Sequence, residues 1–498
     1  MGKNISFIPL GIISLEKGAS TPLYYQVYEQ LRFAILQRQL AGGVRLPSTR
    51  ALSEELSVSR NTIVNAFEQL IAEGYIEGKI GSGSFVTSSL PDDILQMRNR
   101  QKIKANFVKS DGIFEKQTLS RRGARIAKIP VVRGIRSACA FRPGVPALDA
   151  FPFRVWKKLA DRHYQQNNPE LLCYGDPAGY LPLRKAISAY LGAARGLRCD
   201  YEQVIIVTGS QQGMELSGRL LLDPRDAVWV EDPCYPNARR VLSGTGAHLI
   251  SVPVDEEGLD IEAGLSNSET NIRMVYITPS HQYPLGVRMS LARRLKLLDW
   301  ARQNNSWVLE DDYDSEYRYK GRPLVALQGL DQSGVVIYLG TFSKVMFPSL
   351  RLGYIIVPPN LVDPFTKALA VTNRGIPTIE QAIMTDFITA GHFARHIRRM
   401  RNLYAERQAV LVNEIRKRLS GVLEVNPVDS GLNLIGWLAN KDDQEVSIQL
   451  ASAGIVAPPI SDYTEKAEIP SGLLLGYAGV NETQICEGIA RMTEILIP

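Results

Sequence analysis

The sequence lacks several features that define large classes of proteins. Its five cysteines lie far apart and form no C-x-x-C pair, which excludes a disulfide framework and the common zinc motifs. It contains no run of eighteen apolar residues, so we expect no membrane-spanning helix. The first eighteen residues hold a short apolar stretch broken by Pro9 and Gly11, without a small-residue cleavage site, so a signal peptide is not expected. These absences predict a reduced, cytoplasmic protein without zinc.

Two further absences narrow the chemistry. No G-x-S-x-G motif is present, and Thr341 stands where an S-x-x-K motif ending at Lys344 would need serine, which disfavours a serine hydrolase. The chain also lacks an acidic excess, because it contains 57 Lys and Arg residues and 51 Asp and Glu residues. The basic excess lies in residues 98–128, with ten basic and two acidic side chains. This segment either strengthens non-specific binding to phosphates or is only a solvated linker.

The first ninety residues carry a pattern of three helices and a hairpin, in a chain whose 498 residues suit two or three domains. Residues 22–40 have apolar positions at helical spacing, and Ser48 and Ser59 can each cap a further helix. Gly74 ends the last one, and YIEGKIGSGSFV then alternates like a two-stranded wing. The pattern predicts a winged helix-turn-helix, although a small structural helical domain is the alternative.

In a winged helix-turn-helix, the start of the second helix of the turn enters the major groove of DNA. The side chains there are of types that read base edges, while serines and basic residues nearby suit phosphates. The motifs R-L-P-S-x-R, S-R-N-T and G-S-G-S-F-V resemble the GntR family of bacterial regulators, although Lys79 stands where that family more often has arginine. We expect the DNA contacts to come from Arg45, Ser48, Arg50, Ser59, Arg60, Asn61, Thr62, Lys79 and Gly83.

The rest of the chain divides into a linker and a large domain. Residues 88–137 are polar, basic and poorly periodic, and we interpret them as an interdomain linker after a DNA-binding domain at 1–87. From 138 to 498, short apolar runs alternate with helical patterns such as LARRLKLLDWARQ. This alternation predicts an α/β domain with a parallel sheet. Its strands are expected in VIIVTG, AVWVED, RMVYITPS, SWVLEDDY and VVIYLGTFS.

Several polar motifs follow these predicted strands, and each alone is ambiguous. Gly209, Ser210 and Gln211 could bind a phosphate at a helix start or simply cap the helix. Asp311 and Tyr313 could face a ligand or form a solvated acidic loop. Lys344 could be a surface lysine.

Together, however, these motifs meet the needs of one cofactor. A desolvated lysine can condense with an aldehyde, and a carboxylate can keep a pyridine nitrogen protonated. A phenol can bond the ring oxygen, while a helix start, a hydroxyl and an arginine hold a phosphate. These are the requirements of pyridoxal 5′-phosphate (PLP).

The same residues carry a resemblance over nearly the whole chain. FRPGVPALDAFPFRVW, YGDPAGYLPLR, EDPCYP, TPSHQYPLG, EDDYDSEYRY, GTFSK, LRLGY and GHFARHIRRMRNLY resemble the MocR subfamily of GntR-type regulators. In that subfamily a winged helix-turn-helix is fused to a fold-type I aminotransferase-like domain. The resemblance implies that Lys344 carries PLP, Asp311 pairs with the pyridine nitrogen, Tyr313 bonds the ring oxygen and Tyr235 stacks on the ring. It assigns the phosphate to Ser210, Gln211, Thr341 and Arg351, and to Tyr174 reaching the partner subunit of a homodimer.

Two departures from the aminotransferase pattern stand out. The usual N-P-T-G asparagine has no clean match in TPSHQYPLG, so His281 or Gln282 is expected in its place. The arginine that clamps a substrate carboxylate is missing from EKAEIPSGLLLGYAGV, although Arg374 or Arg239 could substitute. Losing this clamp weakens the positioning of an amino acid, which favours a sensor over a working transaminase.

The sequence thus predicts a PLP-dependent transcription regulator, sensing PLP itself or an amine or amino acid. The first alternative is an active aminotransferase with an appended DNA-binding domain. The second is a DNA-binding protein whose large domain only dimerises. That scaffold has no need for Lys344, Asp311 and Arg351 together, so it is disfavoured.

Overall fold

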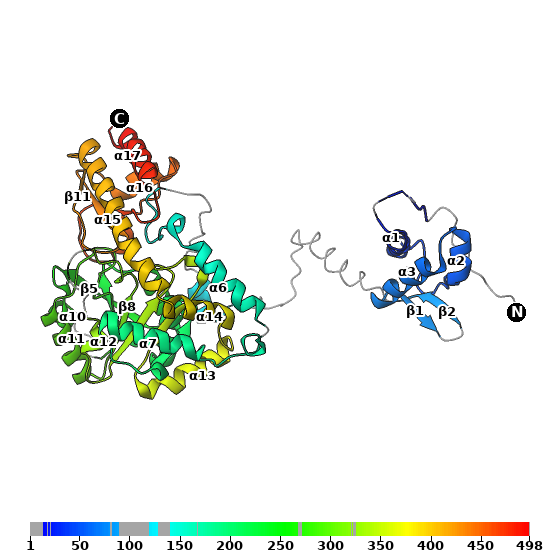
Figure 1. Cartoon of the computed structure of the whole chain (residues 1–498), viewed down its shortest axis with the longest axis horizontal. Coiled ribbons are helices and arrows are strands. Elements are labelled where there is room, and N and C mark those ends of the chain that lie inside the picture. The colour runs from blue at the N-terminus through cyan, green and yellow to red at the C-terminus, as the bar shows by residue number, and fades with distance from the viewer. Residues whose placement is uncertain are drawn as a thin grey trace, which may run out of the picture. The chain divides into compact units, whose positions relative to one another are not determined.

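The computed structural model describes residues 13–16, 18–19, 21–79, 82–88, 119–127, 140–166, 168–266, 271–319, 321 and 325–497. The chain divides into two compact units, Met1–Gln117 and Thr118–Pro498 (Figure 1). Across the described residues no helix has both the length and the apolar character needed to cross a bilayer. Nor does this part of the chain contain a group of His, Cys, Asp and Glu side chains able to hold a metal ion.

The N-terminal unit is the predicted winged helix-turn-helix. Its elements are α1 (Leu23–Leu36), α2 (Thr49–Glu55), α3 (Arg60–Ala72), β1 (Ile76–Lys79) and β2 (Gly83–Val86). The apolar stripes of α1 and α3 pack on each other and on α2 around Leu31, Leu52 and Phe67. The backbone of Ser57 takes a left-handed conformation (φ 51°) in the turn between α2 and α3. The two strands pair antiparallel, as a wing requires.

Most of the predicted linker lies outside the described residues. The described part contains a short helix, α5 (Arg121–Ala127), which the sequence did not predict. It belongs to the large unit, where it packs on α9 (Pro236–Thr245). A Cβ added to Gly244 of α9 would lie 4.0 Å from the Ile126 side chain, so the two helices approach closely at that glycine.

The large unit is built on an eight-stranded sheet of order β3-β10-β9-β8-β7-β4-β5-β6. The strands from β9 through β8, β7 and β4 to β5 are parallel, whereas β10 runs antiparallel to β9 and β3. A parallel sheet was predicted, but β5, β6 and β10 were not among the predicted strands. Only eleven residues join β9 to β10, fewer than a parallel crossover needs. The strands are β3 (Val204–Val207), β4 (Ala227–Asp232), β5 (His248–Asp255), β6 (Gly258–Leu259), β7 (Ile272–Ile277), β8 (Trp307–Asp312), β9 (Val336–Thr341) and β10 (Gly353–Ile356).

Helices cover the sheet on both faces, so β3, β4, β9 and β10 are buried along their whole length, whereas β5 is exposed at both ends. Alternate residues enter different cores: Ile206 and Tyr354 join one apolar cluster, and Val207 and Ile355 join the other. Continuous apolar strands follow from this double coverage. The helices of this layer are α6 (Phe153–Gln165), α7 (Leu181–Arg195), α8 (Ser210–Leu221), α9, α10 (Ile261–Ser266), α11 (Leu291–Gln303), α12 (Leu327–Leu330), α13 (Val362–Thr372) and α14 (Thr378–Thr389).

A smaller C-terminal lobe packs around a second sheet. The long helix α15 (His392–Arg418) leads from the main sheet to this lobe (Figure 1). Its strands β11, β12 and β13 are all antiparallel, which the sequence analysis did not predict. The lobe comprises β11 (Leu423–Val425), β12 (Asn433–Leu438), α16 (Asp443–Ser452), β13 (Gly472–Gly476) and α17 (Glu482–Leu496).

Candidate cofactor site and nucleic-acid interface

A cavity of about 350 Å³ lies where the carboxyl ends of β7, β8 and β9 meet the start of α8. Parallel strands bring their carboxyl ends to one edge of a sheet, which is where α/β proteins bind ligands. Two predicted cofactor residues, Tyr174 and His281, do not line this cavity. The other eight do: Ser210, Gln211, Tyr235, Asp311, Tyr313, Thr341, Lys344 and Arg351.

Lys344 follows β9 and projects its amine into the cavity. Its Nζ donates a hydrogen bond to the backbone carbonyl of Gly144 at 2.9 Å. Burial lowers the pKa of Lys344, while the carboxylates of Asp314 and Asp311 oppose that shift. A lysine with a lowered pKa is more often neutral, and only the neutral amine attacks an aldehyde.

Asp311, at the end of β8, presents an unsatisfied acceptor. Its Oδ2 accepts a hydrogen bond from the Tyr276 hydroxyl at 2.9 Å, but its buried Oδ1 has no partner among the described residues. Burial raises the pKa of Asp311 to about 7, and the Tyr276 hydrogen bond only partly offsets this. A buried acceptor without a donor is costly. A protonated pyridine nitrogen is the kind of donor that would satisfy it.

The other end of the cavity suits a phosphate. Gly209 precedes α8 with φ 130°, no side chain caps the helix, and Gly209, Ser210 and Gln211 at its start line the cavity. Arg351 occupies the left-handed region (φ 49°), and its guanidinium lies 3.7 Å from where a Cβ on Gly209 would be. Gly353 allows this approach, because a Cβ there would lie 2.9 Å from the Gly209 Cα. A helix start, an arginine and an orphaned carboxylate across the cavity together fit PLP.

Aromatic side chains form one wall of the cavity. Tyr235 follows β4, and its hydroxyl accepts a hydrogen bond from the Asn237 amide at 2.9 Å. The ring of Tyr283 meets it edge to face, with centroids 5.4 Å apart. Tyr283 belongs to TPSHQYPLG, where the sequence analysis expected His281 or Gln282 to face the cofactor. Tyr283, not predicted from the sequence, lines the cavity instead.

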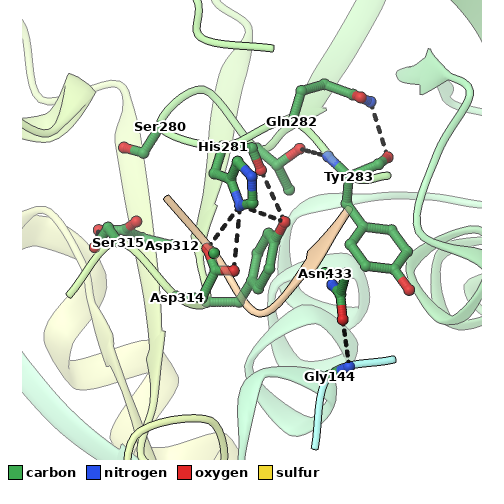
Figure 2. A network of polar contacts seen from close by, with 12 residues as sticks. Gly144, Ser280, His281, Gln282, Tyr283, Asp312, Asp314, Ser315 and Asn433 are labelled. Carbon is green, nitrogen blue, oxygen red and sulfur yellow. Dashed lines mark hydrogen bonds and ion pairs between the residues drawn. The ribbon is translucent and has the colours of Figure 1, made fainter. Parts of the chain in front are cut away.

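The other predicted members of this stretch lie behind the wall. His281 is buried (Figure 2), and its ring lies 6.0 Å from that of Tyr313. The Gln282 amide donates to the backbone carbonyl of Pro233 at 2.7 Å, away from the cavity. Tyr174 is 83% exposed and its ring lies 5.2 Å from the Arg374 guanidinium. Its predicted contact with a partner subunit stays a prediction.

The cavity also contains polar side chains that the sequence analysis missed. Arg142 and Asn433 line it from segments far from the strand ends. The Asn433 Oδ1 accepts a hydrogen bond from the amide of Gly144 at 2.7 Å (Figure 2). Neither residue follows a predicted strand of the large sheet, so spacing alone did not identify them.

Neither arginine suggested as a substitute carboxylate clamp lines the cavity. Arg239 is held by Glu465 and by the Ser251 hydroxyl. Arg374 lies against Tyr174. The segment where the clamp was expected is tied down elsewhere, because the amides of residues 465–467 donate to the Asp232 carboxylate at 2.7–3.0 Å.

In the N-terminal unit, the predicted base-reading residues lie at the start of α3. The Ser59 hydroxyl caps the helix by accepting a hydrogen bond from the Thr62 amide at 3.2 Å. Arg60 and Asn61 are exposed, and Thr62 is half-buried. Ser48 caps α2 in the same way through the Ala51 amide at 3.1 Å. Both caps place a helix start where the sequence analysis expected one.

The basic residues predicted to contact DNA phosphates are exposed, and two of them, Arg45 and Lys79, lie at the wing. Arg45 forms a bridge to the wing at Phe85, and its guanidinium lies 3.1 Å from where a Cβ on Gly83 would be. Arg50 pairs with Glu54 at 3.2 Å on the surface of α2. Lys79 lies over the Phe85 ring, 5.2 Å from its centroid. Their DNA contacts stay predictions.

Comparison with known proteins identifies both units. Residues 23–86 match the bacterial regulatory proteins of the gntR family, and residues 144–492 match aminotransferase class I and II. The chain is 40% identical to the probable rhizopine catabolism regulatory protein MocR of Rhizobium meliloti, over 96% of this chain and 94% of that one. It is 29% identical to the pyridoxine biosynthesis regulator PdxR of Corynebacterium glutamicum, over 97% and 98%.

The large unit also resembles solved aminotransferases. It superposes on kynurenine aminotransferase of Pyrococcus horikoshii with a TM-score of 0.67 and 26% identity, covering 80% of this chain and 98% of that one. The α-aminoadipate aminotransferase LysN of Thermus thermophilus gives 0.66 and 26%, covering 72% and 92%. Both were solved with forms of the PLP cofactor bound.

The fold and the cavity thus define a transcription regulator with a DNA-binding winged helix-turn-helix and a PLP-dependent, aminotransferase-like domain. Within that class, the chain belongs to the MocR subfamily of GntR-type bacterial regulators.

Proposed function

We propose that PLP held at Lys344 serves as a sensor whose state is passed to the DNA-binding unit, and that turnover is not the main task of the cavity. When bound, PLP supplies an electrophilic carbon that reacts with amines. The chain's own residues hold it: Asp311 at the pyridine nitrogen, Tyr313 at the ring oxygen, and Ser210, Gln211, Thr341 and Arg351 at the phosphate.

The observation that carries this proposal is the distribution of cations in the cavity. Arg351 lies at the phosphate end, next to Gly209. Arg142 is the other arginine among the described residues that line the cavity, and it lies on the lysine side, close enough to depress the pKa of Lys344. The segment that carries the carboxylate clamp in aminotransferases contains no arginine here. An amino acid would therefore be positioned weakly for turnover.

A route from the cofactor to the segment before the large domain supports sensing. Gln211 and Asn237 line the cofactor cavity and also a second cavity of about 530 Å³ beneath α5. Arg122 and Ile126 of α5 form the wall of that second cavity. A ligand that contacts Gln211 and Asn237 can thus change how α5 packs on α9. We infer that α5 transmits occupancy toward the DNA-binding unit.

The proposal leaves two kinds of effector open: PLP itself, and an amine or amino acid that reacts with it. The names of two relatives point to different kinds of metabolism. One relative is named for rhizopine catabolism and another for pyridoxine biosynthesis. The missing clamp favours PLP itself, or an amine that needs no carboxylate anchor, over an amino acid. We further propose a homodimer, because exposed Tyr174 has its expected role only across a subunit interface.

The sensor and enzyme proposals are separated by counting turnovers. Purified protein loaded with PLP is mixed with a panel of amines and amino acids, with and without a keto acid to regenerate the cofactor. A sensor gives a spectral change and at most one product per site. Sustained formation of keto acid from any amino acid in the panel would establish an aminotransferase and contradict the proposal.

Attachment of the cofactor is tested separately. Borohydride reduction of the PLP-loaded protein should add the mass of the cofactor to the peptide containing Lys344. Lys344→Ala should abolish that addition, whereas Lys296→Ala, which removes an exposed lysine, should leave it intact. A reduced adduct that persists in Lys344→Ala would refute the assignment of the site.

A further inference from the structure

His281 and Asp314 form a buried histidine–carboxylate pair (Figure 2) next to Tyr313, which lines the cofactor cavity. The Nδ1 of His281 lies 3.0 Å and 3.2 Å from the two carboxylate oxygens of Asp314. The same nitrogen lies 3.2 Å from the Tyr313 hydroxyl. His281 is 7% exposed and Asp314 is 1% exposed, so water competes little for these contacts.

Hydrogen-bond accounting fixes the direction of each contact. Both oxygens of the Asp314 side chain face Nδ1 of His281, and carboxylate oxygens accept, so Nδ1 carries the hydrogen. That hydrogen can be shared with the Tyr313 oxygen, which then acts as an acceptor toward the ring. The proton of the Tyr313 hydroxyl must point elsewhere, and it is donated to the backbone carbonyl of His281 at 3.0 Å. The pair therefore leaves Tyr313 as a hydrogen-bond donor.

Two glycines make room for the imidazole. A Cβ added to Gly431 would overlap the His281 ring, and one added to Gly286 would lie 3.2 Å from its Nε2. A small cavity of about 190 Å³ adjoins the ring on the side of the C-terminal lobe. Tyr313 and Asn433 line both this cavity and the cofactor cavity. The histidine thus supports Tyr313 from behind, without reaching the cofactor cavity itself.

We propose that His281, held by Asp314, is a positioning residue that keeps the Tyr313 hydroxyl a donor toward the phenolic oxygen of the cofactor. The inference rests on the role proposed above for Tyr313. The backbone carbonyl of His281 receives that hydroxyl proton in the structure, and a turn of the hydroxyl about its C–O bond redirects it to a ligand oxygen. No other change in the pair is needed.

The charges around the pair agree with this arrangement. Burial works to lower the pKa of His281, but the Asp314 carboxylate, with a smaller effect from Asp312, raises it overall. Asp314 also opposes the burial that lowers the pKa of Lys344. Burial likewise raises the pKa of Tyr313, so its hydroxyl keeps its proton. Besides Asp314, the groups that act on Tyr313 are Tyr283, Asp311 and Glu231.

The test measures the pH midpoint at which the absorbance of lysine-bound PLP changes, in the full-length protein loaded with PLP. A hydrogen-bond donor to the phenolic oxygen of the cofactor stabilises the deprotonated form, in which that oxygen carries a negative charge and shares no proton. Tyr313→Phe should therefore raise the midpoint by about one pH unit, a tenfold change in proton affinity. His281→Leu should raise it in the same direction by a comparable amount.

A double-mutant cycle separates positioning from general damage. If His281 acts through Tyr313, adding His281→Leu to Tyr313→Phe should change the midpoint no further. His281→Asn, whose amide can still donate to Asp314 and Tyr313, should restore a midpoint near that of the unaltered protein. Where His281→Leu does not fold, His281→Phe supplies a ring of similar shape without the donor.

The outcomes distinguish failure of the inference from failure of the function on which it rests. A shift in Tyr313→Phe but none in His281→Leu, or shifts that simply add, would refute the positioning role alone. An unshifted Tyr313→Phe would refute the assignment of Tyr313 itself, and the inference with it. Equal, non-additive shifts with rescue by asparagine are the result that we expect.

Discussion

At the scale of single residues, the carboxyl groups at and near the cofactor cavity differ in how completely they are hydrogen-bonded. Asp311, Glu231 and Glu310 are all buried, and burial raises the pKa of each to about 7. Glu310 and Glu231 each have hydrogen-bond donors, whereas Asp311 keeps one oxygen without any. The unsatisfied group is thus the one aimed at the cofactor, as expected where function is favoured over stability.

The pKa of Asp311 gives a prediction with a definite sign. The folded, cofactor-free protein keeps a proton on this carboxyl up to a pH of about 7, whereas the unfolded chain releases it near pH 4. Its contribution to stability therefore falls as the pH rises through that window. Asp311→Asn should stabilise the cofactor-free protein at pH 8 by about 1–2 kcal/mol and have little effect near pH 4. The same change should weaken PLP binding at least tenfold.

Thermal melting at several pH values and a PLP titration measure both effects. Asp363→Asn is the matched control, because Asp363 lies exposed on α13, and it should change neither quantity. If Asp311→Asn destabilised the cofactor-free protein equally at every pH, the buried charge would not be the cause.

Sequence patterns predicted the residues that follow strand ends, and the structure brings eight of them into one cavity. They could not distinguish His281, Gln282 and Tyr283, three consecutive residues in one turn. Which of the three faces the cavity depends on the path of that turn, and no spacing rule describes that path. Arg142 and Asn433 were missed because their segments reach the cavity only through the packing of the C-terminal lobe on the main sheet.

At the scale of elements, helix caps were the most dependable signals. Ser48 and Ser59 were expected to begin α2 and α3, and both accept the expected backbone hydrogen bonds. A cap is a local interaction, so it can be found without knowing the fold. The antiparallel direction of β10 and the whole of the second sheet were not predicted, because long-range pairing decides them. Helix α5 was missed because its short stretch showed no recognisable period.

The α3 cap provides the first prediction at this scale. Ser59→Ala should cost the N-terminal unit about 1 kcal/mol, because the Thr62 amide loses its acceptor. The end of α3 expected to read base edges would fray, so specific DNA affinity should fall. Melting of the protein and a DNA titration measure the two effects.

Ser290→Ala is the matched control, because Ser290 caps α11 of the large unit through the Arg293 amide. It should destabilise that unit by a similar amount and leave DNA affinity unchanged. Equal loss of DNA affinity in both variants would show that α3 has no special part in binding.

Helix α5 provides the second prediction. Ile126 lies close to Gly244 on α9, so Ile126→Glu should lift α5 from that surface. PLP should still bind, because the contacting residues of the cofactor cavity are intact. The change in DNA affinity caused by PLP should shrink several-fold, since the proposed route is interrupted.

Leu119→Glu alters a side chain of the same segment that is 65% exposed, and it should leave the response intact. The comparison requires PLP affinity and DNA affinity to be measured on the same preparations. A full response to PLP in Ile126→Glu would exclude α5 as the route.

At the scale of the whole molecule, the chain joins a reader of DNA to a cavity built for a reactive cofactor. The chain divides into two compact units, Met1–Gln117 with the winged helix-turn-helix and Thr118–Pro498 with the cavity. Binding in the cavity can affect DNA binding only if the ligand has different affinities for two conformations of the protein that also differ in their affinity for DNA. The proposed sensor therefore requires a coupling free energy between the binding of PLP and the binding of DNA. A coupling of about 1–3 kcal/mol would suffice for useful control.

The most direct measurement is the affinity of the purified protein for the DNA beside its own gene, at one fixed salt concentration. It is made without PLP, with PLP, and with PLP plus each of a panel of amines, for the unaltered protein and for Lys344→Ala. We predict that PLP, or PLP with one amine, changes the affinity at least about fivefold, and that Lys344→Ala loses the response. An affinity that stays the same under all these conditions would contradict the account.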